Sequence, residues 1–198
     1  MSKDIKGLAL ITGTTSGVGL NTLKPLIRFG WEVIAVNRSN KRAISIAKEF
    51  LTKEEFKNIH FIEIDLSNLD DVRKGCKEIL DRFKKPINSL ICNAAVYKPR
   101  LKRPERSPQG FENSMAVNHF GHFLMIKMLI GNILSSEREI VLNGKSTLFK
   151  PRITVLGTVT ANYSELGGRI PIPAPADLGD LAGFKNGCLL YTSPSPRD

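Results

Sequence analysis

The 198-residue sequence has few of the features that mark membrane, disulfide-stabilised or metal-binding proteins. Its apolar runs are all far shorter than the roughly 20 residues of a membrane-spanning helix, so no span is expected. Three cysteines, Cys76, Cys92 and Cys188, show no paired spacing, which indicates free thiols or a reducing compartment. His119 and His122 have no third ligand at metal spacing. We therefore expect no metal site, and expect these two histidines to pack at a helix edge.

Acidic residues are outnumbered, 19 against 29 lysines and arginines, which gives a formal net charge of +10. The basic excess is densest from Lys98 to Arg106 and suits an anionic ligand or an acidic membrane surface. A solvated basic loop is the alternative. No aromatic residue follows Tyr97 within this run and no nucleic-acid-binding motif is present. Nucleic acid is therefore not expected as a partner.

The stretch from Leu8 to Gly19, LALITGTTSGVG, organises the chain. An apolar run of strand length precedes three glycines, and apolar residues at helical spacing follow them. Gly13 permits a tight turn, Gly17 lets the backbone approach a pyrophosphate, and Gly19 lets the helix pack closely on the strand. The candidate phosphate-binding residues are Gly13, Thr15, Ser16, Gly17, Val18 and Gly19. A glycine-rich turn without a ligand is the alternative.

Further apolar runs alternate with amphipathic patterns, which predicts an α/β fold with a doubly wound parallel sheet. The expected strands are residues 8–12, 32–36, 60–64, 89–92 and 151–157, and the expected helices are residues 18–27, 43–50, 69–83 and 110–134. The strand order 3-2-1-4-5 follows from this fold class. Its ligands bind at the carboxyl ends of the strands.

The residue that follows the second strand predicts the cofactor. An acidic residue at that position binds the ribose 2′-hydroxyl of NAD, whereas a basic residue accommodates the 2′-phosphate of NADP. Arg38 stands there, with Lys41 and Arg42 close behind it in the sequence. The sequence therefore favours NADPH. A loop charge without a ligand is the alternative interpretation of Arg38.

Several motifs resemble those of the short-chain dehydrogenase/reductase family. The spacing G-x-x-x-G-x-G over residues 13–19 is similar to the family's cofactor fingerprint, and Asn93-Ala94-Ala95 follows the fourth strand as its N-A-[AG] motif does. Three longer segments resemble one branch of that family, the light-dependent protochlorophyllide reductases. They are CNAAVY at residues 92–97, NHFGHF at 118–123 and the proline- and glycine-rich stretch at 166–181. Retinol dehydrogenases share the N-H-x-G-H-F string.

The resemblance implies an enzyme that uses NADPH and light to reduce the C17–C18 double bond of protochlorophyllide. It assigns the end of the third strand, Asp65 and Leu66, to the adenine pocket. Asp65 is alternatively the N-cap partner of the turn before the next helix. The resemblance also assigns Asn93, Ala94 and Ala95 to the cofactor side of the sheet.

On the substrate side, the resemblance implies a catalytic water at Asn118, a substrate hydrogen bond from Thr158 and a pigment contact from Tyr97. An amide bonded to a neighbouring backbone carbonyl is the alternative for Asn118. The resemblance further implies homo-oligomers and contact with thylakoid-type membranes. We expect a chloroplast protein in a eukaryote, or a cytoplasmic or thylakoid-associated one in a cyanobacterium. No signal or transit peptide is expected before the first strand, so either the protein works where it is made or a targeting segment is missing from this sequence.

Family members carry a Tyr-x-x-x-Lys pair, in which the lysine lowers the pKa of the tyrosine. None of Tyr97, Tyr163 and Tyr191 has a lysine four residues later. The final segment, CLLYTSPSPRD at residues 188–198, resembles the translation of a sequencing adapter, with a natural Ser/Pro-rich terminus as the alternative. We expect residues 1–187 to be a partial NADPH-binding reductase domain, incomplete at the C-terminus.

This chain is accordingly expected to be inactive and marginally stable, and its full-length parent to be the enzyme. Two other functions fit the parent. One is an NADP-dependent reductase of a lipophilic carbonyl, of the retinol dehydrogenase kind. The other is an NADPH-binding protein without catalytic activity.

Overall fold

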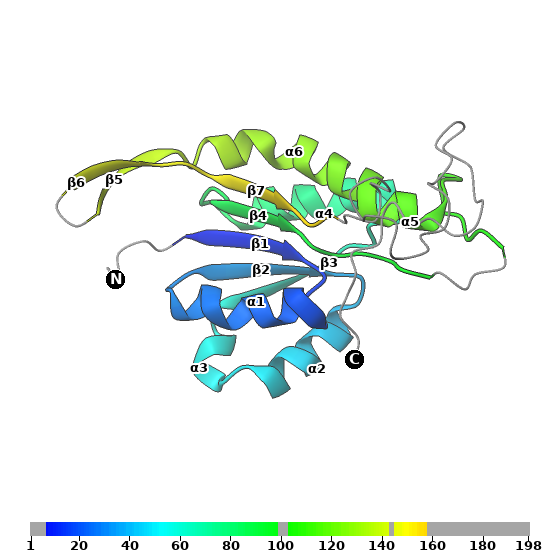
Figure 1. Cartoon of the computed structure of the whole chain (residues 1–198), viewed down its shortest axis with the longest axis horizontal. Helices are drawn as coiled ribbons and strands as arrows, with labels where there is room; N and C mark the ends of the chain where they lie inside the picture. Colours follow the sequence, from blue (N-terminus) through cyan, green and yellow to red (C-terminus); the bar gives the residue numbers. More distant parts are fainter. Residues whose placement is uncertain (1–6, 99–102, 143–144, 158–198) are drawn as a thin grey trace, which may run out of the picture.

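A parallel sheet of five strands forms the centre of the computed structural model, which describes residues 7–98, 103–142 and 145–157 (Figure 1). Its strands are β1 (Leu8–Thr12), β2 (Glu32–Asn37), β3 (Ile59–Glu63), β4 (Ser89–Cys92) and β7 (Arg152–Val155). They lie in the order β3-β2-β1-β4-β7, and every pairing is parallel. The predicted doubly wound sheet and its order 3-2-1-4-5 are confirmed.

Helices cover the two faces of this sheet (Figure 1). On one side lie α1 (Gly17–Arg28), α2 (Asn40–Phe50) and α3 (Lys53–Phe56), and on the other lie α4 (Leu69–Arg82) and α6 (His122–Leu134). Because both faces are covered, every residue of β1 is buried. Ile11 packs in the cluster with Leu23 of α1, whereas Leu10 packs in the cluster with Met125 of α6. The carboxyl end of β1 is thereby fixed between the two layers.

The helix expected over residues 110–134 starts later and contains a wider turn. Its parts are α5 (Asn113–Met115), the π-helical segment η1 (Ala116–Gly121) and α6. The expected start at Gly110 is wrong, because Gly110 has a φ of +85° and the cap is Glu112. The buried Glu112 carboxylate accepts hydrogen bonds from the N–H groups of Ser114 and Met115, both at 2.9 Å.

An antiparallel pair of strands that was not predicted, β5 (Arg138–Leu142) and β6 (Lys145–Phe149), follows α6. Leu142 pairs with Lys145, and the two residues between them in the sequence are Asn143 and Gly144. Asn-Gly between alternating apolar residues is the strongest sequence signal for a two-residue hairpin. The sequence contains the Asn-Gly dipeptide but not the alternation, because Ile140, Val141 and Leu142 are consecutive apolar residues.

Several predictions fall outside the described residues: Thr158, Tyr163, Tyr191, the insertion at 166–181 and the segment at 188–198. In the part of the chain that the structure describes, no helix is long and apolar enough to cross a membrane. The same part contains no group of three histidine, cysteine, aspartate or glutamate side chains that could hold a metal ion.

Candidate functional site

The turn between β1 and α1 brings the backbone very close to the end of β4. Gly13 has a φ of +74° and Gly17 a φ of +56°, a region that favours glycine. A Cβ on Gly13 would lie 2.8 Å from the Ala94 Cα, and a Cβ on Gly19 would lie 2.1 Å from the Gly13 carbonyl oxygen. The tight turn expected at Gly13 and the close packing expected at Gly19 are therefore confirmed.

The N-terminus of α1 opens at the same edge of the sheet. Ser16 is the N-cap residue with an extended backbone, and the first turn, which includes Val18, carries no acidic side chain. First-turn N–H groups of an α-helix have no carbonyl partner within the helix, and the helix dipole places positive charge there. This end of α1 can therefore accept an anion.

A cleft lies beside the glycine turn, between the ends of β2, β3 and β4. Its apolar lining comes from Val36, Ile64, Leu66, Ala94, Ala95, Val96 and Val117. Its remaining lining comes from Gly13, Thr15, Asn37, Arg38, Ser39, Arg42 and Asp65. An apolar pocket with a few convergent polar groups is typical of sites for small organic ligands. Here it adjoins an anion-binding helix end, a combination that suits a nucleotide.

The cleft brings together many of the residues that the sequence selected for a cofactor, namely Gly13, Thr15, Arg38, Asp65, Leu66, Ala94 and Ala95. The others selected from the glycine turn, Ser16, Gly17, Val18 and Gly19, form the adjoining start of α1 and do not line the cleft. Direct contact of any of these residues with a cofactor stays a prediction.

Asn37, which the sequence analysis missed, fixes the start of the glycine turn. Its Oδ1 accepts a hydrogen bond from the Thr14 backbone N–H at 2.8 Å, and its Nδ2 donates to the Thr14 Oγ1 at 2.8 Å. Both residues are buried. A polar residue at the end of an otherwise apolar buried strand is the signal that could have identified it.

The side chain of Asn93 lies against the glycine turn and does not line the cleft. Its Nδ2 donates to the carbonyl oxygens of Thr12 and Gly13, both at 2.9 Å. The backbone N–H groups of Asn93 and Ala94 both donate to the Thr12 Oγ1, again at 2.9 Å. Asn93 thus holds the ends of β1 and β4 together, and its direct contact with a cofactor stays a prediction.

Asp65 belongs both to the cleft and to the turn before α4. Its Oδ1 accepts hydrogen bonds from the backbone N–H and the hydroxyl of Ser67, at 2.9 and 2.7 Å. The N-cap of α4 is Asn68, whose side chain accepts from the Asp70 N–H at 3.1 Å. Asp65 therefore orders the turn before α4, but the N-cap role that the alternative interpretation gave it is wrong, because Asn68 caps the helix.

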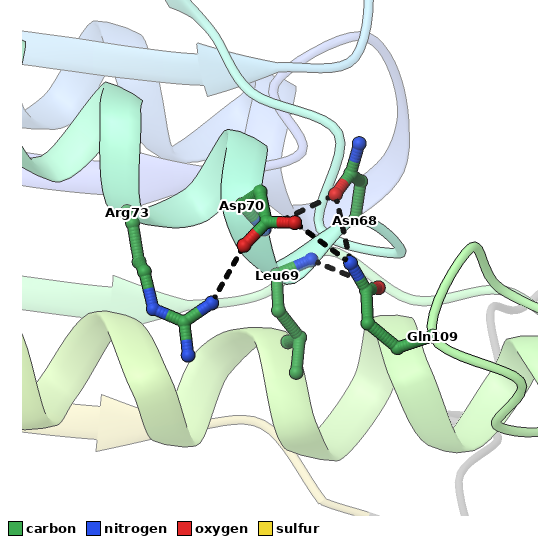
Figure 2. Close-up of polar contacts among 5 residues, drawn as sticks. All are labelled: Asn68, Leu69, Asp70, Arg73 and Gln109. Carbon is green, nitrogen blue, oxygen red and sulfur yellow. Dashed lines mark hydrogen bonds and ion pairs between the residues drawn. The ribbon is translucent and has the colours of Figure 1, made fainter.

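A second group of contacts anchors the segment before α5 to the start of α4 (Figure 2). Gln109 accepts a hydrogen bond from the Leu69 N–H through its Oε1 at 3.3 Å. Its Nε2 donates to Asn68 Oδ1 at 3.2 Å and to Asp70 Oδ2 at 3.4 Å. Asp70 also pairs with Arg73 at 2.9 Å. Gln109 thus acts as an additional cap for α4 and positions the chain that leads into η1.

Asn118 of η1 binds the backbone of Val96, a residue of the cleft. Its Oδ1 accepts from the Val96 N–H at 2.7 Å, and its Nδ2 donates to the Val96 carbonyl oxygen at 3.0 Å. A backbone contact is the alternative that the sequence left open for this amide, and the structure shows it. The role of Asn118 in holding a catalytic water stays a prediction. Tyr97 follows Val96 and is 53% exposed.

His122 lies in the protein interior, so the expectation that it packs at a helix edge is wrong. It is only 3% exposed, with its Nε2 2.9 Å from the Thr12 Oγ1 and its Nδ1 3.3 Å from the Asn118 carbonyl oxygen. Burial lowers the pKa of His122 to about 4, although its hydrogen bond with the Asn118 carbonyl opposes that shift. His119, one residue before Phe120, is exposed.

Residues 7–152 match the family model described as short chain dehydrogenase. The chain therefore belongs to the short-chain dehydrogenase family of oxidoreductases. Among curated relatives, it is 37% identical over 187 residues to a protein of Cucumis sativus named chloroplastic protochlorophyllide reductase. It is 34% identical over 187 residues to the protein of that name from Chlamydomonas reinhardtii. Each match covers 92% of this chain and 42% of the relative, so the chain spans less than half the length of these relatives.

Solved structures of dehydrogenases share the fold. An alcohol dehydrogenase from Thermococcus sibiricus, complexed with 5-hydroxy-NADP, is 26% identical with a TM-score of 0.54, and the match covers 66% of this chain and 55% of that one. A 3-ketoacyl-(acyl-carrier-protein) reductase from Brucella melitensis, complexed with NADH, is 28% identical with a TM-score of 0.52. That match covers 68% of this chain and 52% of the reductase.

Proposed function

We propose that this chain binds NADPH and forms the cofactor-binding part of a light-dependent protochlorophyllide reductase. The observation that carries the proposal is the similarity to protochlorophyllide reductases over 92% of the chain. The cleft supports it, because it combines an apolar surface for an adenine base with a helix N-terminus that suits a pyrophosphate. Gly19 leaves no room for a Cβ at that turn.

The charge of the cleft favours NADPH over NADH. Arg38 and Arg42 both line the cleft just after β2, and Asn37 ends that strand in place of an acidic residue. Two guanidinium groups suit the 2′-phosphate of NADPH, which NADH lacks. Ser39 lies between them in the sequence, lines the same cleft and adds a hydroxyl donor.

The proposed reaction adds a hydride and a proton across the C17–C18 double bond of protochlorophyllide, giving chlorophyllide and NADP⁺. NADPH supplies the hydride. In this chain, Arg38 and Arg42 bind the cofactor, and Asn118 fixes the Val96 backbone at the cleft. The sequence contains no Tyr-x-x-x-Lys pair, so this chain alone is not expected to deliver the proton.

The first test compares NADPH and NADH binding to the 198-residue chain by titration calorimetry. Replacing Arg38 and Arg42 together by alanine should weaken NADPH binding at least tenfold and leave NADH binding unchanged, since a charge-assisted hydrogen bond contributes about 1.5–3 kcal/mol. Arg82→Ala, at the far end of α4, is the matched control and should change neither affinity. Equal losses for both cofactors would contradict the NADPH assignment.

The second test uses the full-length protein of which this chain is a part. It is mixed in darkness with NADPH and protochlorophyllide and is then illuminated. A red shift of the pigment absorbance to that of chlorophyllide supports the proposed reaction. Reduction of a retinoid carbonyl without this shift supports the retinol dehydrogenase alternative. Cofactor binding with neither reaction supports the non-catalytic alternative.

The names of the relatives also bear on location and partners. Because those relatives are named chloroplastic, we propose a plastid location. The basic residues proposed to meet a thylakoid surface are partly paired: Lys98 contacts Glu105 at 2.5 Å, and Arg106 donates to the Gly110 carbonyl oxygen at 2.8 Å. Membrane contact and homo-oligomer formation stay predictions.

A further inference from the structure

The hydroxyl of Thr12 has three partners, and their number fixes the direction of each hydrogen bond. A threonine hydroxyl offers one hydrogen and two lone pairs. The N–H groups of Asn93 and Ala94 donate to the Thr12 Oγ1, both at 2.9 Å, and they occupy the two lone pairs. The hydroxyl hydrogen is then left for the third partner, the His122 Nε2 at 2.9 Å.

These directions determine the tautomer of His122. Because the Nε2 accepts from Thr12, it carries no hydrogen, and the hydrogen of the neutral ring lies on the Nδ1. The Nδ1 can then donate to the Asn118 carbonyl oxygen at 3.3 Å. One neutral imidazole thus satisfies a strand hydroxyl on one side and a π-helical carbonyl on the other.

We propose that His122 is a positioning residue for the cofactor, because it orients the Thr12 hydroxyl that holds the Asn93 and Ala94 backbone at the wall of the cleft. This inference rests on the proposed function. It goes beyond that function because it assigns cofactor affinity to a residue that does not line the cleft.

The effect can reach the cofactor through Ala94. Ala94 lines the cleft, and its Cα would lie 2.8 Å from a Cβ on Gly13, so the two backbones are in close contact. If the Thr12 hydroxyl rotated, one of the two backbone N–H groups that donate to its oxygen would lose its acceptor. Ala94 or Asn93 would then shift against the glycine turn, where the pyrophosphate is proposed to bind.

Protonation of His122 would force that change. A protonated ring carries hydrogens on both nitrogens, so the Nε2 would point a hydrogen at Thr12, whose lone pairs are already occupied. The groups that face His122 are uncharged: the Thr12 hydroxyl from β1 and the Asn118 carbonyl from η1. Among the described residues, the titratable side chain that acts on it is His119, which further disfavours its charged form.

The test measures NADP⁺ affinity of the 198-residue chain by calorimetry for three variants. His122→Phe keeps a ring without an acceptor and should weaken binding about tenfold at pH 7.5. His122→Gln retains an acceptor oxygen and should stay within about threefold of the unmodified chain. His119→Gln removes the exposed histidine of the same helical run and is the matched control, expected to bind normally.

A pH series separates positioning from a purely structural role. Affinity of the unmodified chain should fall more steeply between pH 6 and about 4 than that of His122→Gln. The ligand's own 2′-phosphate titrates equally in both proteins, so the difference between the two curves reports His122.

Identical pH curves would overturn the proposal. Normal NADP⁺ affinity of His122→Phe, whatever its melting temperature, would also overturn it and leave the proposed function intact. If the unmodified chain binds neither NADP⁺ nor NADPH, the proposed function fails, and this inference fails with it.

Discussion

Gly121 of η1 lies directly against Leu66, one of the residues between β3 and α4 that line the cleft. A Cβ on Gly121 would stand 2.4 Å from the Leu66 carbonyl oxygen and 3.0 Å from its Cβ. The closest of these atoms is backbone, which cannot yield as a flexible side chain would. The helical run from α5 to α6 and the wall of the cleft are therefore held at a fixed separation.

Gly121→Ala should consequently destabilise the protein by about 1–3 kcal/mol, the usual cost of overpacking. Gly131→Ala, also in a helix, meets nothing within 4 Å and is the matched control. Because alanine favours a helix over glycine, that control should stabilise by about 0.5–1 kcal/mol. Urea unfolding followed by circular dichroism measures both changes. Equal effects at the two positions would show that the contact with Leu66 does not matter.

Stability should depend on pH through His122. Its pKa is lowered by burial to about 4, from an ordinary value of 6.5, so the unfolded chain binds more protons between these values. The contribution of neutral, buried His122 to the free energy of unfolding is complete above pH 6.5 and declines as the pH falls toward 4. It amounts to about 3 kcal/mol in total. Urea unfolding at pH 7 and pH 4.5 measures it. His122→Gln should lose less stability over the same interval, and an identical loss would refute the assignment.

Gln109→Ala should loosen the segment before α5, because it removes the acceptor of the Leu69 N–H (Figure 2). Loss of a helix-capping acceptor costs about 1 kcal/mol. Hydrogen exchange at the Leu69 amide should accelerate by the factor that corresponds to this loss of free energy. Arg73→Ala breaks only an exposed ion pair with Asp70 and serves as the control, with an expected change below about 0.5 kcal/mol. Similar exchange rates in the two variants would argue against the capping role of Gln109.

Cys76 and Cys92 should not react in the folded protein. Both are buried, and desolvation raises the pKa of each thiol to about 12, so almost no thiolate forms at pH 8. Alkylation with iodoacetamide followed by peptide mapping should modify these two cysteines only after denaturant is added. Labelling of either one in buffer would mean that the core opens readily.

The sheet could be predicted from the sequence because each strand is a short apolar run bounded by turn residues, as in Leu8–Thr12 and Ser89–Cys92. The start of the long helix could not be located in the same way. Glutamate is an uncommon N-cap, and the capping role of Glu112 depends on its carboxylate being folded back and buried. The helical spacing of apolar residues from Phe111 onward therefore led to a predicted start at Gly110.

The site was predictable where backbone geometry dictates the residue, as at Gly13 and Gly19, and where charge follows a strand, as at Arg38. The contact between Thr12 and His122 was not, because the two residues are 110 positions apart and meet only through tertiary packing. A buried hydrogen bond between residues so far apart produces no periodic pattern in the sequence.

The π-helical run Ala116–Gly121 lies between α5 and α6 and separates the part of the helix near the cleft from the part packed in the core. Asn118 lies within this wider turn, and the buried stripe of α6 follows it at His122, Met125, Leu129 and Ile133. Deleting one residue within the run would let α6 keep its place in the core while rotating everything upstream by about 100°. The two hydrogen bonds between Asn118 and the Val96 backbone should then be lost, so the length of this run sets the position of the residue that holds one wall of the cleft.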